Sequence, residues 1–140
     1  MIKNLVIVSA FLTLQFVAYN LQGQTSPKTQ PAAEYKIPPE ASNRSNPVKP
    51  SPESLAAGKK IYAYDCAMCH GKSGDGKGEI KDTKGISNFT DPAALKSYTD
   101  GDLFYIIQKG KGDMPPEGDR AKEEDLWNLV NYVRSFANKK

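Results

Sequence analysis

The stretch Cys66-Ala67-Met68-Cys69-His70 decides the fold of this chain, because it has the C-x-x-C-H spacing of a covalent c-type haem attachment site. Each thiol can form a thioether bond with one haem vinyl group, and the adjacent imidazole can reach the iron from the proximal side. The chain of 140 residues has two cysteines and one histidine, and all three lie in this stretch. The motif therefore predicts one covalent haem at Cys66, Cys69 and His70.

Other uses of a closely spaced cysteine pair fit this sequence less well. A structural zinc site usually takes four Cys or His ligands in two separated pairs, and this chain has a single cluster. A thioredoxin-like redox pair is expected in a βαβ unit, and no apolar β-branched run flanks Cys66. A disulfide between Cys66 and Cys69 would close a very short loop and leave His70 without a role. We therefore favour haem attachment over these three alternatives.

The pattern of residues 52–140 predicts one small helical domain. A first helix is expected after Ser51, whose hydroxyl can cap it, with Pro52 at the first position, where a missing N–H costs nothing. Several glycines follow His70 closely and predict a tight loop. Two further helices, over residues 93–96 and 103–109, are predicted from Asp91-Pro92 and from the capping-box pattern Thr99-Asp100-Gly101-Asp102.

The last predicted helix has the clearest amphipathic pattern. Acidic residues 123–125 begin it, as the helix dipole favours. No segment of the domain has a confident strand pattern. The predicted fold class is therefore all-α, with about four short helices around one covalently bound haem. The apolar residues of the last helix recur at helical spacing and are Leu126, Leu129, Val130, Val133 and Phe136.

The distal face of the iron needs a separate prediction, because electron carriers fill that position and catalysts or gas binders leave it open. The absence of a second histidine excludes bis-histidine ligation. Of the three methionines, Met1 lies in the leader and Met68 lies between the attachment cysteines, which leaves Met114. Met114 lies in a loop between glycines and prolines, so we expect it to be the distal iron ligand. A loop methionine that only fills space is the alternative.

Further segments match the motifs of a known family. These are His70-Gly71-x-x-Gly74-x-Gly76, Met114-Pro115 and Leu129-Val130-Asn131-Tyr132-Val133. On these residues and the haem motif, residues 52–137 resemble the class I c-type cytochromes, small monohaem domains that also occur as cytochrome subunits of larger redox complexes. The resemblance implies a cytochrome c-like fold in which the first and last helices cross. It assigns that crossing to Gly58, Tyr62 and Tyr132.

The resemblance also implies the function. The family transfers single electrons between partner proteins, so redox donor and acceptor proteins are the expected partners and no catalytic residue is expected. The chain is then not an enzyme, although it could be a non-catalytic subunit of a larger oxidoreductase. The alternative is a haem-based peroxidase or gas-binding sensor with an open distal site, for which Arg120 is the nearest acid–base candidate. A thiol module without haem is the third hypothesis.

Two further sets of residues are expected near the haem. One set could frame its exposed edge and steer an acidic partner, although interleaved acidic residues favour an ordinary solvated surface. That set is Lys72, Lys77, Lys109 and Lys111. The other set is expected to form the apolar wall around the haem and consists of Leu95, Leu103, Ile106, Ile107 and Trp127.

Residues 1–23 have the pattern of a secretory signal peptide. Lys3 precedes an apolar run from Leu5 to Tyr19, and a polar exit follows near Gly23, after which we expect cleavage. The alternative is an uncleaved N-terminal anchor, although the run is shorter than the approximately 20 apolar residues that a spanning helix needs. Both alternatives predict an exported, periplasmic domain, either free or tethered on the outer side of the cytoplasmic membrane.

Residues 24–51 are expected to be a disordered linker. They contain six of the ten prolines and almost no large apolar residue, so they cannot bury enough surface to order themselves. Leader and linker together carry five basic and two acidic residues, which accounts for the whole formal charge of +3. Residues 52–140 carry 14 charges of each sign and form no basic stripe, so nucleic acid is not an expected partner.

Overall fold

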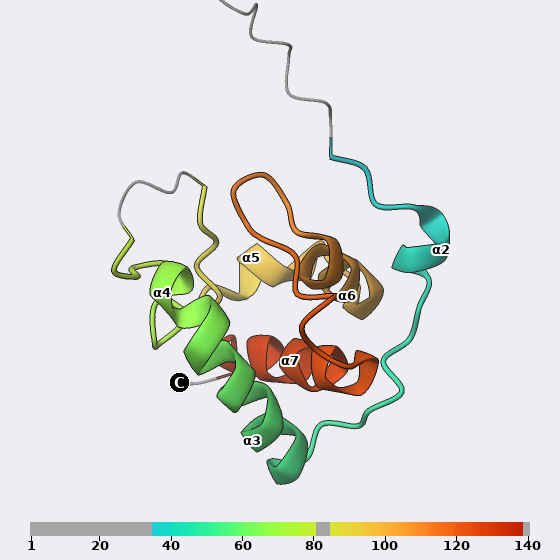
Figure 1. Cartoon of the computed structure of the whole chain (residues 1–140), viewed down its shortest axis with the longest axis horizontal. Helices are drawn as coiled ribbons and strands as arrows, with labels where there is room; N and C mark the ends of the chain where they lie inside the picture. The colour runs from blue at the N-terminus through green and yellow to red at the C-terminus, as the bar shows by residue number, and fades with distance from the viewer. Residues whose placement is uncertain (1–34, 81–84, 139–140) are drawn as a thin grey trace, which may run out of the picture. The chain divides into compact units, whose positions relative to one another are not determined.

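The computed structural model describes residues 35–80 and 85–138, and the predicted signal peptide lies outside these ranges (Figure 1). Within them the chain is helical and has no strand, so the predicted all-α fold class is confirmed. None of the helices described is long and apolar enough to cross a bilayer. In chain order the helices are α2 (Pro39–Ser42), α3 (Pro52–Ile61), the π-helical η2 (Tyr62–Cys66), α4 (Ala67–His70), α5 (Pro92–Lys96), α6 (Asp100–Lys109) and α7 (Glu123–Phe136).

Helix α3 begins where its capping residue predicts. Ser51 Oγ accepts a hydrogen bond from the backbone N–H of Ser54 at 3.2 Å, and Pro52 occupies the first position. The helix then continues without a break through η2 into α4, which ends at His70. Single π-helical turns inside α-helices are frequent at functional sites. Here the turn carries Cys66 and connects the first helix directly to the haem motif.

Helices α3 and α7 cross in close contact (Figure 1). Their backbones approach at Gly58, where a Cβ atom would overlap the carbonyl oxygen of Asn128 and lie 2.8 Å from the Cβ of Tyr132. Tyr62 is 1% exposed and packs edge-on against Tyr132, with ring centroids 5.3 Å apart. The crossing through a glycine and two aromatic rings, which the family resemblance implied, is confirmed.

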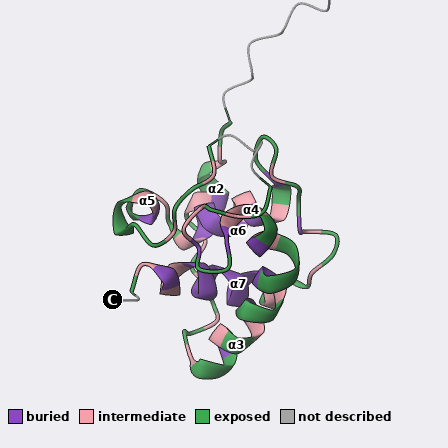
Figure 2. Ribbon diagram, turned by 90° about the vertical axis from the view of Figure 1, so that its left-hand side faces the viewer, coloured by how far each residue is buried: buried purple, intermediate pink, exposed green. Residues whose placement is uncertain are grey.

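Helix α7 supplies much of the core. Figure 2 shows most of its length as buried, whereas α3 is largely exposed on its outer side. Fully burying one large apolar side chain contributes about 1.5–3 kcal/mol relative to leaving it exposed. The predicted apolar stripe is confirmed, because every member is buried: Leu126, Leu129, Val130, Val133 and Phe136.

The α5–α6 corner is capped and fastened to α7. Thr99 and Asp102 form the predicted capping box, in which each side chain accepts a hydrogen bond from the other residue's backbone N–H. Arg134 of α7 donates to the carbonyl oxygens of Leu95 at 2.9 Å and Tyr98 at 2.6 Å. It also forms an ion pair with Asp100. One guanidinium therefore holds both short helices in place.

Residues 35–51, which we call the N-terminal strap, pack against the helices and include α2. Ala41 is 8% exposed, and Arg44 lies over the ring of Phe104, 4.4 Å from its centroid. Asn46 Nδ2 donates to Asn131 Oδ1 at 2.9 Å. The prediction of a disordered linker therefore does not hold for residues 35–51, because their polar groups find specific partners on α6 and α7. Residues 24–34 lie outside the described residues.

Candidate functional site

A cavity of about 420 Å³, here called the haem cavity, lies between the C-x-x-C-H motif, the α5–α6 corner and the loop that carries Met114. Its volume is within the range of roughly 300–1,000 Å³ that is usual for cofactor pockets. The structure brings the four predicted site residues together on its lining: Cys66, Cys69, His70 and Met114. That these residues bind haem and iron stays a prediction of the sequence.

The apolar wall of the haem cavity matches the predicted set with one exception. Leu95, Leu103, Ile106 and Ile107 all line it. Trp127 does not, so its prediction as a wall residue is wrong. Its ring is 1% exposed and stacks on Phe104 with centroids 4.1 Å apart, because this side of α7 faces α6 and the strap.

His70 presents a partly buried imidazole to the site. Its ring stacks on Phe89 with centroids 4.6 Å apart and an interplanar angle of 21°. Within the described part of the chain, its Nδ1 atom is buried and makes no hydrogen bond. Burial lowers the pKa of His70, and the nearby backbone of Ser87 opposes that shift. A partly buried imidazole beside two cysteines fits the donor set that a c-type haem requires.

Phe89 is a site residue that the sequence did not indicate, because it lies well beyond the motif. The loop that follows His70 folds back and brings Phe89 to it, and the Phe89 N–H donates to the carbonyl oxygen of Gly74 at 2.7 Å. Gly74 has a φ of +75°, and a Cβ atom there would lie 2.8 Å from the ring of Phe136. The glycine therefore lets the loop lie directly on α7.

The carbonyl oxygens of His70 and of Gly71, the residue after the motif, also accept hydrogen bonds. Tyr62 Oη donates to the Gly71 carbonyl oxygen at 2.8 Å, and the Gly76 N–H donates to the His70 carbonyl oxygen at 2.9 Å. These bonds fix the chain on the C-terminal side of His70. The imidazole is thereby held in one position by its own backbone and by the Phe89 ring.

Cys66 and Cys69 are both free thiols that are partly buried on the haem cavity. Burial raises the pKa of Cys66 to about 12, and the carboxylates of Glu117 and Asp65 add to the shift. Two adjacent thiols on an apolar cavity that also contains an imidazole suit covalent attachment of haem vinyl groups.

Met114 is held in a closed loop between α6 and α7. The N–H of Met114 donates to the carbonyl oxygen of Lys111 at 3.0 Å, and the return bond measures 3.1 Å. Gly110 has a φ of +76°, and a Cβ atom there would overlap the Met114 carbonyl oxygen. Glu117 N–H donates to the Ile107 carbonyl oxygen at 2.9 Å, which fastens the far side of the loop to α6.

Of the four lysines expected to frame the haem, Lys111 is the one on the haem cavity. Its Nζ donates to Tyr98 Oη at 3.3 Å. Lys72 and Lys77 line a different hollow, and Lys109 lines neither. A framing role for those three is therefore not supported by their positions.

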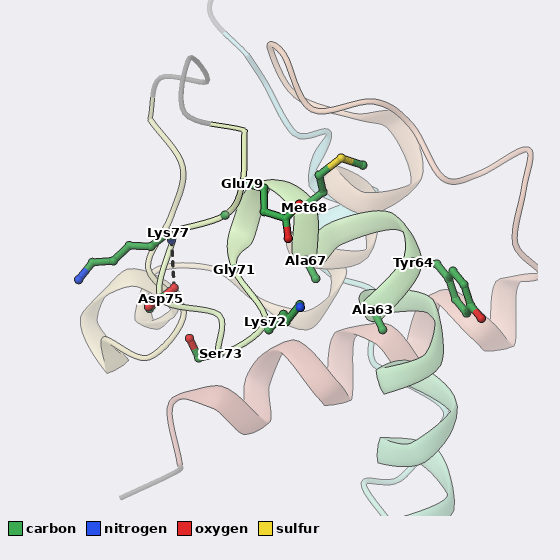
Figure 3. A pocket seen from close by; sticks show the side chains of 11 residues that line it. Ala63, Tyr64, Ala67, Met68, Gly71, Lys72, Ser73, Asp75, Lys77 and Glu79 are labelled. Atoms are coloured by element: carbon green, nitrogen blue, oxygen red, sulfur yellow. Dashed lines mark hydrogen bonds between the residues drawn. The ribbon is translucent and has the colours of Figure 1, made fainter.

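The second hollow, of about 500 Å³, lies on the outer side of η2 and α4 and is the more open of the two (Figure 3). Tyr64 and Met68 contribute exposed side chains to it, at 84% and 50% exposure. Charges of both signs surround it, from Lys72, Asp75, Lys77 and Glu79. None of the four predicted site residues lines this hollow, so the chemistry of the motif belongs to the haem cavity.

The haem cavity is also lined by a carboxylate that the sequence analysis did not single out. Glu117 is 3% exposed and lines the cavity, and its carboxylate pairs with the guanidinium of Arg120. Arg120 Nη1 lies 3.3 Å from Asp65 Oδ1. The sequence held one signal for this ion pair, because Arg120 follows Glu117 by three residues and such spacing allows the two side chains to meet. Burial raises the pKa of Glu117, Asp65 adds to that shift and Arg120 opposes it.

The family model described as cytochrome C oxidase, cbb3-type, subunit III matches residues 53–133. Chloroplastic cytochrome c6 of Chlamydomonas reinhardtii is 33% identical over 88 residues, which cover 59% of this chain and 55% of that protein. The cbb3-type cytochrome c oxidase subunit CcoP of Rubrivivax gelatinosus is 32% identical over 120 residues, which cover 82% of this chain and 38% of that protein.

A solved structure supports the fold. A chain of the Kuenenia stuttgartiensis reducing HAO-like protein complex superposes with a TM-score of 0.52 at 25% identity, covering 64% of this chain and 46% of that chain. This chain thus spans about half or less of the length of these three proteins. The matched relatives are c-type cytochromes, and haem c is their covalently bound cofactor. This chain belongs to the family of cytochrome C oxidase, cbb3-type, subunit III, and is a class I c-type cytochrome.

Proposed function

We propose that this protein transfers single electrons through one haem c whose iron is bound by His70 and Met114. The observation that carries the proposal is that both side chains line the same cavity although they come from different segments of the chain. Both segments are fixed by backbone hydrogen bonds, so neither ligand needs to move when the iron changes its oxidation state. A filled distal position distinguishes electron carriers from oxygen-activating haem proteins.

The residues of the cavity have distinct roles in this proposal. Cys66 and Cys69 would hold the haem by thioether bonds, and the haem would supply the one-electron couple. Phe89 fixes the orientation of the His70 ring by stacking on it. Lys111 and Tyr98 line the cavity and would offer a cation and a hydroxyl group to polar groups of the haem. The apolar wall excludes water and is formed by Leu95, Leu103, Ile106 and Ile107.

The partners and the location are part of the proposal. One relative is a subunit of a cbb3-type oxidase, and the structural neighbour belongs to a multi-protein complex. We therefore infer that the chain exchanges electrons with redox proteins, as a carrier or as a non-catalytic subunit, and is not itself an enzyme. Its N-terminal signal pattern supports an exported domain outside the cytoplasmic membrane, free or tethered.

Carbon monoxide binding tests the filled distal position. The reduced wild-type protein should not bind carbon monoxide readily, because Met114 occupies the site that the gas needs. Met114→Ala should bind it readily. The matched control is Met68→Ala, which removes an exposed methionine that does not line the haem cavity and should behave as the wild type. Rapid binding by the wild type would instead favour the gas-binding or peroxidase alternative.

A further inference from the structure

Three carboxylates line the haem cavity among the described residues: Asp65, Asp113 and Glu117. Asp113 is exposed, and the Asp65 side chain is 31% exposed, whereas the Glu117 side chain is 4% exposed. Water screens an exposed charge strongly, and a buried charge acts on its surroundings through a lower effective dielectric. Glu117 is therefore the carboxylate on this wall whose charge is least screened.

The position of Glu117 is fixed on both sides of its backbone. Its N–H donates to the carbonyl oxygen of Ile107 at 2.9 Å, and its own carbonyl oxygen accepts from the N–H groups of Arg120 at 3.0 Å and Ala121 at 3.1 Å. The backbone of the loop is thus held on both sides of Glu117, and the carboxylate itself is held by its ion pair with Arg120.

Arg120 compensates this buried charge only in part. Its guanidinium pairs with Glu117 and also lies 3.3 Å from Asp65 of η2, so one cation serves two anions. Its own side chain is 54% exposed, which weakens its effect inside the cavity. The cluster of Asp65, Glu117 and Arg120 thus carries a net formal charge of −1 next to the attachment site Cys66.

A negative charge next to a haem acts differently on the two oxidation states. Ferric haem carries one positive charge more than ferrous haem, so a nearby anion stabilises the ferric state and lowers the reduction potential. Reduction removes that positive charge and makes protonation of the same anion easier. Among the described residues, the titratable groups that act on Glu117 are Asp65 and Cys66 from η2 and Arg120 from its own loop, and the Cys66 thiol no longer titrates once it is bound to haem. Ile107 and Gln108 of α6 are uncharged.

We propose that Glu117 sets the reduction potential of the haem and couples electron transfer to a proton, an inference that rests on the proposed electron-transfer function. When one electron from the donor protein reduces the iron from ferric to ferrous, Glu117 takes one proton from solvent on its carboxylate. When the acceptor protein removes the electron, Glu117 returns the proton to solvent. Burial already raises the pKa of this carboxyl group, which brings it toward the pH range in which such exchange occurs.

The test is a redox titration of the holoprotein, followed by its visible spectrum, at several values between about pH 5 and about pH 9. The wild-type potential should fall as pH rises through the titration of Glu117. Glu117→Gln should raise the potential at neutral pH and remove that part of the pH dependence. Arg120→Gln should move the titration to higher pH, because it removes the cation that favours the ionised carboxylate.

The matched control is Asp119→Asn, which removes the same charge from an exposed position two residues away and should leave the potential unchanged. A merely structural ion pair would change the melting temperature of Glu117→Gln but not its pH profile. The proposal is overturned if Glu117→Gln keeps the wild-type potential and pH profile, or if Arg120→Gln leaves the titration in place. Loss of methionine ligation would show separately, as absence of the sulfur-to-iron absorption band from the wild-type protein.

Discussion

Gly58 of α3 lies so close to Tyr132 of α7 that a Cβ atom on residue 58 would be 2.8 Å from the Tyr132 Cβ. The same atom would overlap the carbonyl oxygen of Asn128. Any side chain at position 58 must therefore push the two helices apart. Because α3 continues directly into the haem motif, this contact between two helices fixes where the motif lies on the core.

Gly58→Ala should destabilise the protein by about 1–3 kcal/mol, the usual cost of inserting a methyl group into a packed contact. The measurement is chemical denaturation of the holoprotein, followed by circular dichroism. Ala56→Ser, at an exposed position of the same helix, is the control and should change the free energy of unfolding by less than about 0.5 kcal/mol. Equal stability of the alanine variant and the wild type would show that α3 and α7 do not pack as described.

The strap can be tested through its hydrogen bond to Asn131, which is 5% exposed. Asn131 Nδ2 donates to the Val48 carbonyl oxygen and to Ser54 Oγ, each at 2.9 Å, and its Oδ1 accepts from Asn46. Asn46→Ala would leave that oxygen without this donor, at a cost of about 1–3 kcal/mol.

Ser45→Ala is the matched control for Asn46→Ala, since Ser45 is an exposed residue of the same strap. It should leave the denaturation midpoint close to that of the wild type. If Asn46→Ala were as stable as Ser45→Ala, the strap would contribute nothing to the stability of the domain. The disordered linker predicted from composition would then be the better description of residues 35–51.

Asp102 gives a prediction about acid stability. Burial alone would raise its pKa, but hydrogen bonds from Ser42 and Thr99, together with the charge of Arg134, hold the pKa below its ordinary value of 3.8. A carboxyl group with a lowered pKa stabilises the fold above its unfolded-state pKa, and this contribution is lost as pH falls through the folded-state pKa. Asp102→Asn should therefore be less stable than the wild type at neutral pH.

The difference in stability between Asp102→Asn and the wild type should close in strong acid, as pH falls below the ordinary value of 3.8 and through the lowered folded-state pKa, where the wild type loses the same charge. Denaturation midpoints of both proteins across this range measure it. Asp119→Asn, at an exposed position, should follow the wild type throughout. If the difference in stability between Asp102→Asn and the wild type stayed constant or widened as pH falls, the ionised carboxylate of Asp102 would not be what stabilises the α5–α6 corner.

Local signals predicted the helices and the motif well. Ser51 and Thr99 cap their helices as expected, because a capping hydroxyl interacts with backbone groups only a few residues away. The buried apolar residues of α7 likewise recur at helical spacing in the sequence, so this stripe could be predicted. Cys66, His70 and Met114, which the motif and the methionine count singled out, line one cavity.

Features that depend on distant partners could not be predicted in this way. The strap was expected to be disordered because its composition is polar, yet Arg44 and Asn46 find partners on α6 and α7. Glu117 belongs to a residue type that is almost never fully buried unless paired, and the spacing to Arg120 alone does not tell that the pair lies against a cavity. Trp127 was predicted to be a wall residue of the haem, but it packs against Phe104.

Ligation by both His70 and Met114 is the central claim, and the near-infrared absorption spectrum of the ferric holoprotein tests it most directly. A sulfur-to-iron charge-transfer band should be present in the wild type and in Met68→Ala, and absent from Met114→Ala. Absence of the band from the wild type, or its survival in Met114→Ala, would contradict the claim that Met114 closes the distal side of the iron.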